Sequence, residues 1–326
     1  MTIPVATVPD SALDLMPKDT GDLGGSLLSM LQKAFAELTP HITQSAGICL
    51  CLIAAVMLMA ILRQLPGKSV SVVEFAGVLA VAGYLLHQTN SMVDMAANTV
   101  VELSEYGKLL LPVMTAALAS QGGVTGSAAL YTGTAVFDTL LSSAIANLLI
   151  PLVYIFLAAS VACAATGEEI LKKLRDLIKW LMTWGLKILL YVFTGYMGLT
   201  GVITGTADEA AVKATKLTMS GMIPVVGGIL SDASEAVIVG AGMMKSAAGV
   251  YGMVALIAIW LTPFLNIGIS YLLLKLSGAV CDSFGVKKIS GLIKSFSEAM
   301  GLLLGMTASV CILLLISIIC FMKGMK

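Results

Sequence analysis

Few side chains in this sequence have the types and spacing that catalysis needs. The only two histidines are His41 and His87, and each lies near the end of an apolar stretch. The sequence has no H-E-x-x-H motif and no clustered pair of carboxylates, so no site with a nucleophile, a base and an oxyanion hole can be assembled from it. The segment PGKS at 66–69 resembles the end of a phosphate-binding loop, but Leu62 stands where that motif requires its first glycine. We therefore expect neither an enzyme nor a cofactor or metal site.

The remaining candidates are polar side chains within or at the edge of apolar segments, namely Asp138, Asn147 and Asn266. The two asparagines lie near Pro151 and Pro263. An uncompensated charge at the centre of a bilayer costs about 2.5–3.5 kcal/mol on insertion scales, so such groups usually face protein or water. The three side chains could line a path or tie helices together, and for the asparagines we favour the tying role.

The composition around these residues is that of a polytopic helical membrane protein. Of the 326 residues, 58% are hydrophobic and only 12% are charged, and the mean hydropathy is +0.97. A soluble domain carries about a quarter charged residues. The 19 basic and 19 acidic residues cancel, so no net charge favours nucleic acid as a partner.

Six segments are long and apolar enough for membrane-spanning helices, which need about 20 residues. They are predicted near residues 44–62, 70–88, 138–165, 182–204, 250–276 and 299–321. Lysine and arginine concentrate around residues 63–68, 172–179 and 287–294, and the positive-inside rule places these connections in the cytoplasm. The alternate connections, 89–108 and 205–216, are acidic or neutral. Six crossings then leave both termini outside.

The part of the chain before the first span is predicted to differ from the rest. Residues 1–24 hold three prolines and four aspartates and are predicted to form a flexible polar arm. In 25–40, apolar residues recur from Leu27 at helical spacing, which predicts a short amphipathic helix on a membrane, on a partner or on the protein's own body. Residues 41–69 then contain the first span and a cytoplasmic turn.

A basic segment, GEEILKKLRDLIKW at 167–180, follows the third predicted span. Helical spacing places the lysines and arginine on one face and an apolar set on the other, consisting of Ile170, Leu174, Leu177 and Leu181. This pattern predicts an interfacial helix at the cytoplasmic surface, attracted to anionic headgroups. The alternative is that the charges only enforce the orientation of the chain.

The sequence also repeats itself with a constant offset of 112 residues. Gly83-Tyr84 recurs as Gly195-Tyr196, Pro112-Val113 as Pro224-Val225, and Pro151 as Pro263. The offset predicts two membrane repeats, 70–181 and 182–292, with a final span in 293–326. Because each repeat contains two crossings, both copies should have the same orientation in the membrane.

Each predicted repeat contains a Pro-Val segment, at 109–130 and at 217–244, whose two apolar legs are too short to cross a bilayer. Lipid cannot satisfy backbone N–H and C=O groups, so non-helical backbone at membrane depth must be buried in protein or line a watery cavity. We predict a re-entrant helical hairpin in each repeat, and the alternative is a kinked, buried helix that only packs. The residues of the predicted hairpin motif are Pro112, Gly122, Gly123, Pro224, Gly227, Gly228, Ser231 and Asp232.

The second of these segments carries a family resemblance. The stretch KLTMSGMIPVVGGILSDASEAVIVGAGMMKSAAGVYG, followed by KLSGAVCDSFG and the last basic connection, resembles the stage III sporulation protein AE family of endospore formers. The resemblance covers about residues 40–326 and implies a mother-cell membrane component of the channel complex that joins mother cell and forespore. It implies, as partners, the other stage III A-operon proteins and the forespore protein stage II Q. It supplies no catalytic or ligand residues.

Two functions from different classes follow from these observations. The leading hypothesis is a channel- or permease-like subunit of that complex, and the alternative is a non-conducting scaffold that anchors the soluble rings of the complex. A free-standing secondary transporter is a weaker third, because no buried acidic relay is evident. A continuous polar lining would favour the first, and a dry centre with large exposed apolar faces would favour the second. Membrane lipid is an expected partner, and the sequence leaves a homo-oligomer open.

Overall fold

The computed structural model describes residues 15, 23–62, 70–120, 124–199 and 247–324. The elements in this part of the chain are α2 (Leu23–Leu62), α3 (Val70–Ser120), α4 (Val124–Ala144), the short π-helix η2 (Ile145–Leu149), α5 (Ile150–Thr166), α6 (Glu169–Leu199), α9 (Ala247–Ser283) and α10 (Lys287–Gly324). Among them are six helical segments long and apolar enough to cross a membrane. Within these described residues, the prediction of an all-helical fold with six such segments is confirmed.

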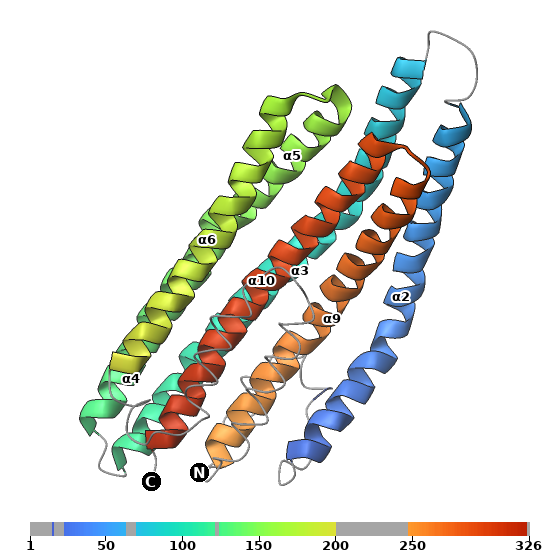
Figure 1. The fold of residues 1–326 in the computed structure, drawn as a ribbon. Coiled ribbons are helices and arrows are strands. Elements are labelled where there is room, and N and C mark those ends of the chain that lie inside the picture. Colours follow the sequence, from blue (N-terminus) through green and yellow to red (C-terminus); the bar gives the residue numbers. More distant parts are fainter. Residues whose placement is uncertain (1–14, 16–22, 63–69, 121–123, 200–246, 325–326) are drawn as a thin grey trace.

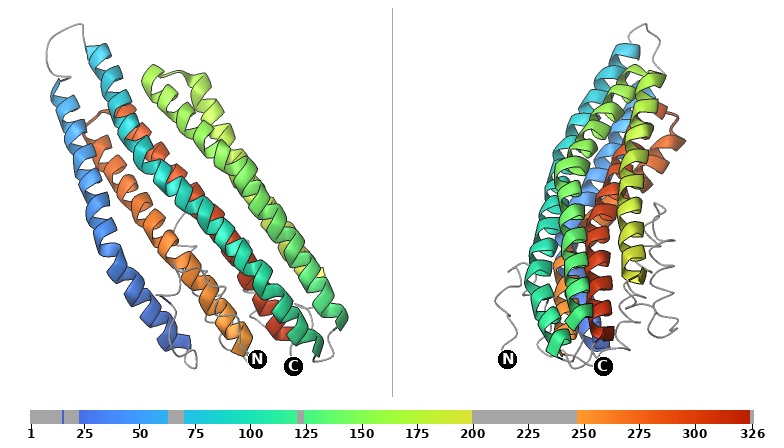
Figure 2. Two further views of the ribbon diagram at one scale, coloured as in Figure 1. Left: turned by 180° about the vertical axis from the view of Figure 1, so that it is seen from behind. Right: turned by 90° about the vertical axis from the view of Figure 1, so that its left-hand side faces the viewer.

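The helices lie alongside one another and alternate in direction (Figures 1 and 2). The α5–α6 and α9–α10 turns therefore lie at the end of the bundle where α2 ends and α3 begins (Figure 1). Two basic groups of the sequence, 172–179 and 287–294, are at or near this end, which we call the basic end. The third group, 63–68, lies outside the described residues. Alternating helices with these two basic groups at one end are what we expect for six crossings.

Glycines allow the two described turns at the basic end. Gly167 has a φ of 79° and ends α5, where its N–H donates a hydrogen bond of 2.8 Å to the carbonyl oxygen of Cys163. Gly285 has a φ of 75° in the turn between α9 and α10. The left-handed conformation costs glycine little because it has no Cβ, so both helices can end abruptly.

The helix that rises from α4 to α5 contains a local irregularity before Pro151. Residues 145–149 form the π-helix η2, and Pro151 lies at the first turn of α5. Proline has no N–H and crowds the preceding turn, so it disrupts the regular hydrogen-bond ladder of an α-helix. A π-type insertion is one way for the backbone to absorb that disruption without ending the helix.

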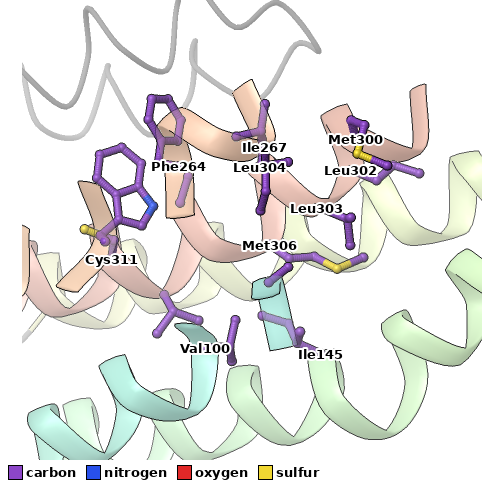
Figure 3. Packing of buried hydrophobic residues seen from close by; sticks show 14 of the residues in the cluster. Val100, Ile145, Phe264, Ile267, Met300, Leu302, Leu303, Leu304, Met306 and Cys311 are labelled. Carbon is purple, nitrogen blue, oxygen red and sulfur yellow. The ribbon is translucent and has the colours of Figure 1, made fainter. Parts of the chain in front are cut away.

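The two C-terminal helices form the centre of the bundle. In the spanning segments of α9 and α10, 78% and 83% of the most apolar stretch is buried, against 28% to 39% in the other four. Figure 3 shows Met306 of α10 pointing toward Ile145 of η2, while Leu304 lies close to Ile267 of α9. α9 and α10 also form the most extensive helix pair among the described elements. The outer helices expose large apolar side chains instead, as a membrane protein does toward lipid.

The outer connection predicted at 89–108 is not a separate segment, because it continues the helix that begins at Val70. α3 is a single helix of 51 residues. Its exposed side carries Asn90, Asp94, Asn98 and Glu105, and buried residues recur at helical spacing on its other side. At 1.5 Å per residue, a helix of 51 residues is about 76 Å long, whereas the hydrocarbon core of a bilayer is about 30 Å thick. Part of a spanning α3 must therefore lie outside the hydrocarbon core, and we expect it to be this polar stretch.

The short legs predicted for 109–130 also differ from the structure. The first leg is the end of α3 and the second is the start of α4, so each continues into a long helix. The apolar register of α3 runs on through this leg, where Leu111, Met114 and Leu118 are buried. Pro112 lies within α3 and is exposed. The other predicted motif residues lie outside the described part of the chain, namely Gly122, Gly123, Pro224, Gly227, Gly228, Ser231 and Asp232.

Two predicted segments are continuous with longer helices. The amphipathic helix predicted for 25–40 is the first part of α2, which continues to Leu62. The basic segment predicted as a separate interfacial helix forms the first turns of α6. It runs antiparallel to α5 (Figure 1), so it does not lie flat across the end of the bundle.

Candidate functional site

A buried carboxyl group lies between α3 and α4. Asp138 is only 1% exposed, and the Ser104 hydroxyl donates a hydrogen bond of 2.6 Å to Asp138 Oδ2. Asp138 Oδ1 has no hydrogen-bond partner among the residues that the structure describes. Lys108, one turn beyond Ser104 on α3, is close enough for its charge to act on Asp138, but the two form no ion pair. A buried carboxylate that is only partly satisfied is costly, so this position calls for an explanation.

One turn before Asp138, a pair of hydroxyl groups joins α4 to α10. Thr134 Oγ1 donates to Ser317 Oγ at 2.9 Å, and Ser317 Oγ donates to the carbonyl oxygen of Leu313 at 2.9 Å. Both side chains are fully buried. These hydrogen bonds offset the cost of removing the hydroxyls from water. Together with the Ser104–Asp138 bond, they connect three helices through side chains.

The spacing of residues along α4 explains why these polar groups face inward. Leu130, Thr134, Asp138, Leu141 and Ile145 are all buried and recur every three or four residues, so they share one face of the helix. Asp138 therefore lies on the same face as Ile145, which packs against α10 in the hydrophobic core (Figure 3).

α6 packs closely on α4 at an adjacent face. A Cβ at Gly133 would overlap the Tyr196 ring, and the Tyr196 hydroxyl donates a hydrogen bond of 3.1 Å to the carbonyl oxygen of Ala129. Phe137 and Phe193 form an edge-to-face pair with ring centroids 5.5 Å apart. Gly133 thus permits the close approach of α4 and α6.

A second polar region lies between α6 and α10, nearer the basic end. Lys179 Nζ is 3.0 Å from Glu298 Oε1, and Arg175 donates a hydrogen bond of 3.3 Å to Ser295. The opposite face of α6 is apolar and exposed, with Ile170 at 76% and Trp184 at 48%. The segment is amphipathic as predicted, but Arg175 and Lys179 face a neighbouring helix, Lys172 and Lys173 are exposed, and the apolar side chains face outward.

The two asparagines differ in environment. Asn266 on α9 is buried, and its Oδ1 has no hydrogen-bond partner among the described residues. The same is true of Trp260 Nε1 and Thr262 Oγ1 on the same helix. Asn147 lies in η2 with an exposed side chain that donates a hydrogen bond of 3.1 Å to Ser143 on its own helix. Asn147 therefore ties no two helices together in the described part of the chain.

The structure does not bring the three predicted polar residues together. Asp138 faces α3, Asn147 faces outward, and Asn266 lies on α9, whose main partners are α10, α2 and α3. Ser104 could not be predicted from the sequence, because it is one of many hydroxyl residues in apolar helices and carries no local signal. The inward orientation of Arg175 and Lys179 could not be predicted either, because helical spacing identifies two faces but not which one turns inward.

Comparisons with known proteins place the chain in a family. The family model described as Stage III sporulation protein AE matches residues 14–324. The chain is 23% identical over 276 residues to Stage III sporulation protein AE of Bacillus subtilis (strain 168), covering 83% of this chain and 69% of that protein. No solved structure matches the fold.

Proposed function

This chain belongs to the stage III sporulation protein AE family, and from that premise we propose that it is a channel- or permease-like subunit of the complex that links mother cell and forespore. Its place is the mother-cell membrane around the forespore. Its partners are the other stage III A-operon proteins and, across the intermembrane space, stage II sporulation protein Q. Membrane lipid surrounds the outward faces of the helices.

The observation that carries this proposal is the orientation of α6. In lipid, charged side chains are tolerated where they face the interior of a bundle or a watery cavity, and such positions often line transport paths. Arg175 and Lys179 face α10, while Trp180 and Trp184 are exposed on the other side. The contacts with Ser295 and Glu298 also tie α6 to α10, so the access of water to the space between these helices decides whether they line a path. The polar contacts of Ser104, Asp138 and Thr134 extend the polar interior toward the other end of the bundle.

The predicted repeats and hairpins form the finer part of the proposal. α3 and α6 run in one direction, whereas α5, which contains Pro151, and α9, which contains Pro263, run in the other (Figure 1). These directions fit two repeats of the same orientation. From the sequence alone we propose a re-entrant hairpin for 217–244, which lies outside the described residues and combines two short apolar legs with adjacent glycines.

A scaffold is the second candidate, and the packing of α9 and α10 favours it. Phe264, Ile267, Leu303 and Met306 form part of a continuous apolar cluster along these two helices (Figure 3). A tightly packed apolar centre leaves no space for a solute among these side chains. A non-conducting anchor for soluble rings would need such a rigid core and lipid-facing outer helices, and nothing more.

The two candidates differ in whether water reaches the space between α6 and α10. We would replace the six native cysteines and place single cysteines at Thr183 or Ser295, which face this space, or at Ile188, which is 50% exposed on the outer apolar face. For a path, the first two positions react with a small charged thiol reagent in native membranes of sporulating cells, and position 188 does not. If all three are inert while the protein accumulates and the complex assembles, the scaffold is correct.

A further inference from the structure

Asp138 is a buried acid without a charged partner. Its side chain is 1% exposed, Oδ2 accepts a single side-chain hydrogen bond from Ser104, and Oδ1 has no partner among the described residues. One turn further along α4, the Ser142 hydroxyl is also buried without a hydrogen-bond partner in the same part of the chain. An ionised carboxylate in this position would have only one hydrogen bond to replace the water it lost.

The elements packed around Asp138 bring little opposite charge to it. Asp138 is the only charged residue of α4, and α10 has none between Glu298 and Lys323. On α3, Lys108 acts on Asp138 only through space, since its side chain is exposed, and Glu105 beside it carries the opposite sign. The stretch of α6 that packs on α4 has a single cation, Lys187, which lies six residues before Phe193, the residue that contacts Phe137. No ion pair neutralises Asp138 in the described part of the chain.

We propose that Asp138 is a proton-binding site and that the bundle, as described here, holds it as a neutral carboxylic acid. The proton resides on Oδ1, the oxygen without a partner, and Oδ2 remains the carbonyl oxygen that accepts the hydrogen bond from Ser104. Neutralising a buried carboxyl group removes the large cost of desolvating its charge and leaves only the smaller cost of an unpaired O–H group.

The position of Asp138 allows its carboxyl group to release the proton again. Asp138 lies between two helices that carry exposed charged side chains only on α3, where Lys108 and Glu105 reach solvent. If α3 and α4 separate by the width of a water molecule, Oδ1 can release its proton to water and the carboxylate that remains is stabilised by hydration and by Lys108. Protonation of Asp138 does not depend on whether the protein forms a channel.

Infrared difference spectroscopy of the purified full chain in lipid tests this assignment. At neutral pH, the spectrum of the wild type minus that of Asp138→Asn should contain the C=O stretching band of a protonated carboxylic acid, and the band should disappear at high pH. Ser104→Ala should keep the band and move it to higher frequency, because Oδ2 loses its hydrogen bond. A purely structural role for Ser104 would leave the frequency unchanged.

Two outcomes would overturn the proposal. One is a difference spectrum at neutral pH that shows carboxylate bands in place of the carboxylic acid band. The other is loss of the acid band when sodium chloride replaces choline chloride at constant ionic strength, which would make the site a metal-cation site. Should Asp138→Asn fail to accumulate, the spectrum of the wild type minus Ser104→Ala decides alone: its paired positive and negative bands lie in the carboxylic acid region if the proposal is right and in the carboxylate region if it is wrong.

Discussion

At the scale of single residues, two of the polar contacts between the described helices are made by buried side chains, Ser104 with Asp138 and Thr134 with Ser317. Asp138 could be selected from the sequence because a lone acid in an apolar stretch is conspicuous. Its partner Ser104, 34 residues away, could not be selected, because the sequence has many serines and threonines and each can bond to its own helix. Thr115, Thr139 and Thr194 all do so. Whether a hydroxyl reaches a neighbouring helix depends on where that helix lies.

Thr134→Val should destabilise the bundle by about 0.5–1.5 kcal/mol, the usual net value of a buried hydrogen bond. Valine keeps the shape of threonine but removes the donor that bonds to Ser317 on α10. Thr139→Val is the matched control on the same helix, since the exposed Thr139 bonds only to the carbonyl oxygen of Ala135. Thermal unfolding of both variants in the same detergent measures the difference. Equal effects would show that the link between α4 and α10 contributes nothing.

Gly133→Ala should cost more than a glycine-to-alanine exchange elsewhere in the bundle. The added methyl group would overlap the Tyr196 ring, and overpacking of a filled site costs about 1–3 kcal/mol. At Gly83 in α3 a Cβ meets nothing within 4 Å, so Gly83→Ala should be neutral or stabilise the helix slightly. The measurement is the unfolding temperature of each purified variant. A harmless Gly133→Ala would mean that α6 packs on α4 less closely than described.

At the scale of the elements, α6 shows what periodicity can and cannot predict. The amphipathic pattern of 167–180 was recognised correctly, yet the segment begins a 31-residue helix. The sequence could not show that Arg175 and Lys179 meet α10, because an isolated amphipathic helix prefers to turn its charges toward water or headgroups. Ser295 and Glu298 provide partners on α10 that reverse this preference locally.

The pair Lys179–Glu298 offers a test of this orientation by charge exchange. Lys179→Glu places two acids opposite each other across α6 and α10 and should lower the unfolding temperature. Adding Glu298→Lys should raise the unfolding temperature again in part, because the two side chains then carry opposite charges and attract each other. Lys173→Glu is the control, since Lys173 is exposed on the same helix. If the double variant is no more stable than Lys179→Glu alone, the two side chains do not face each other in the membrane.

At the scale of the whole molecule, the length of the helices separates two regions. α3 is more than twice as long as the hydrocarbon core is thick, so part of it must lie outside lipid. Its polar surface, from Asn90 to Lys108, lies away from the basic end (Figure 1). From the positive-inside rule, we expect this part of the bundle to extend from the membrane on the side opposite the cytoplasm.

Cysteine labelling in intact cells tests this placement. In a variant without native cysteines, Glu105→Cys should react with a membrane-impermeant thiol reagent from outside, because its side chain is exposed on the polar part of α3. Lys173→Cys, exposed near the basic end, should react only after the cells are permeabilised. Reaction of Lys173→Cys in intact cells would reverse the orientation or change the number of crossings.

The sequence by itself determined the class of the protein, the approximate positions of six spanning helices and the grouping of basic residues. These properties depend on local composition, which a short window of residues contains in full. It did not determine that 89–108 is helical, since a polar stretch suits a loop as well as a helix that leaves the membrane. Only the tertiary structure decided which polar groups face one another, as Thr134 and Ser317 do across 183 residues. The physical reason is that helix pairing depends on the packing of every face at once, and no single periodic pattern contains that information.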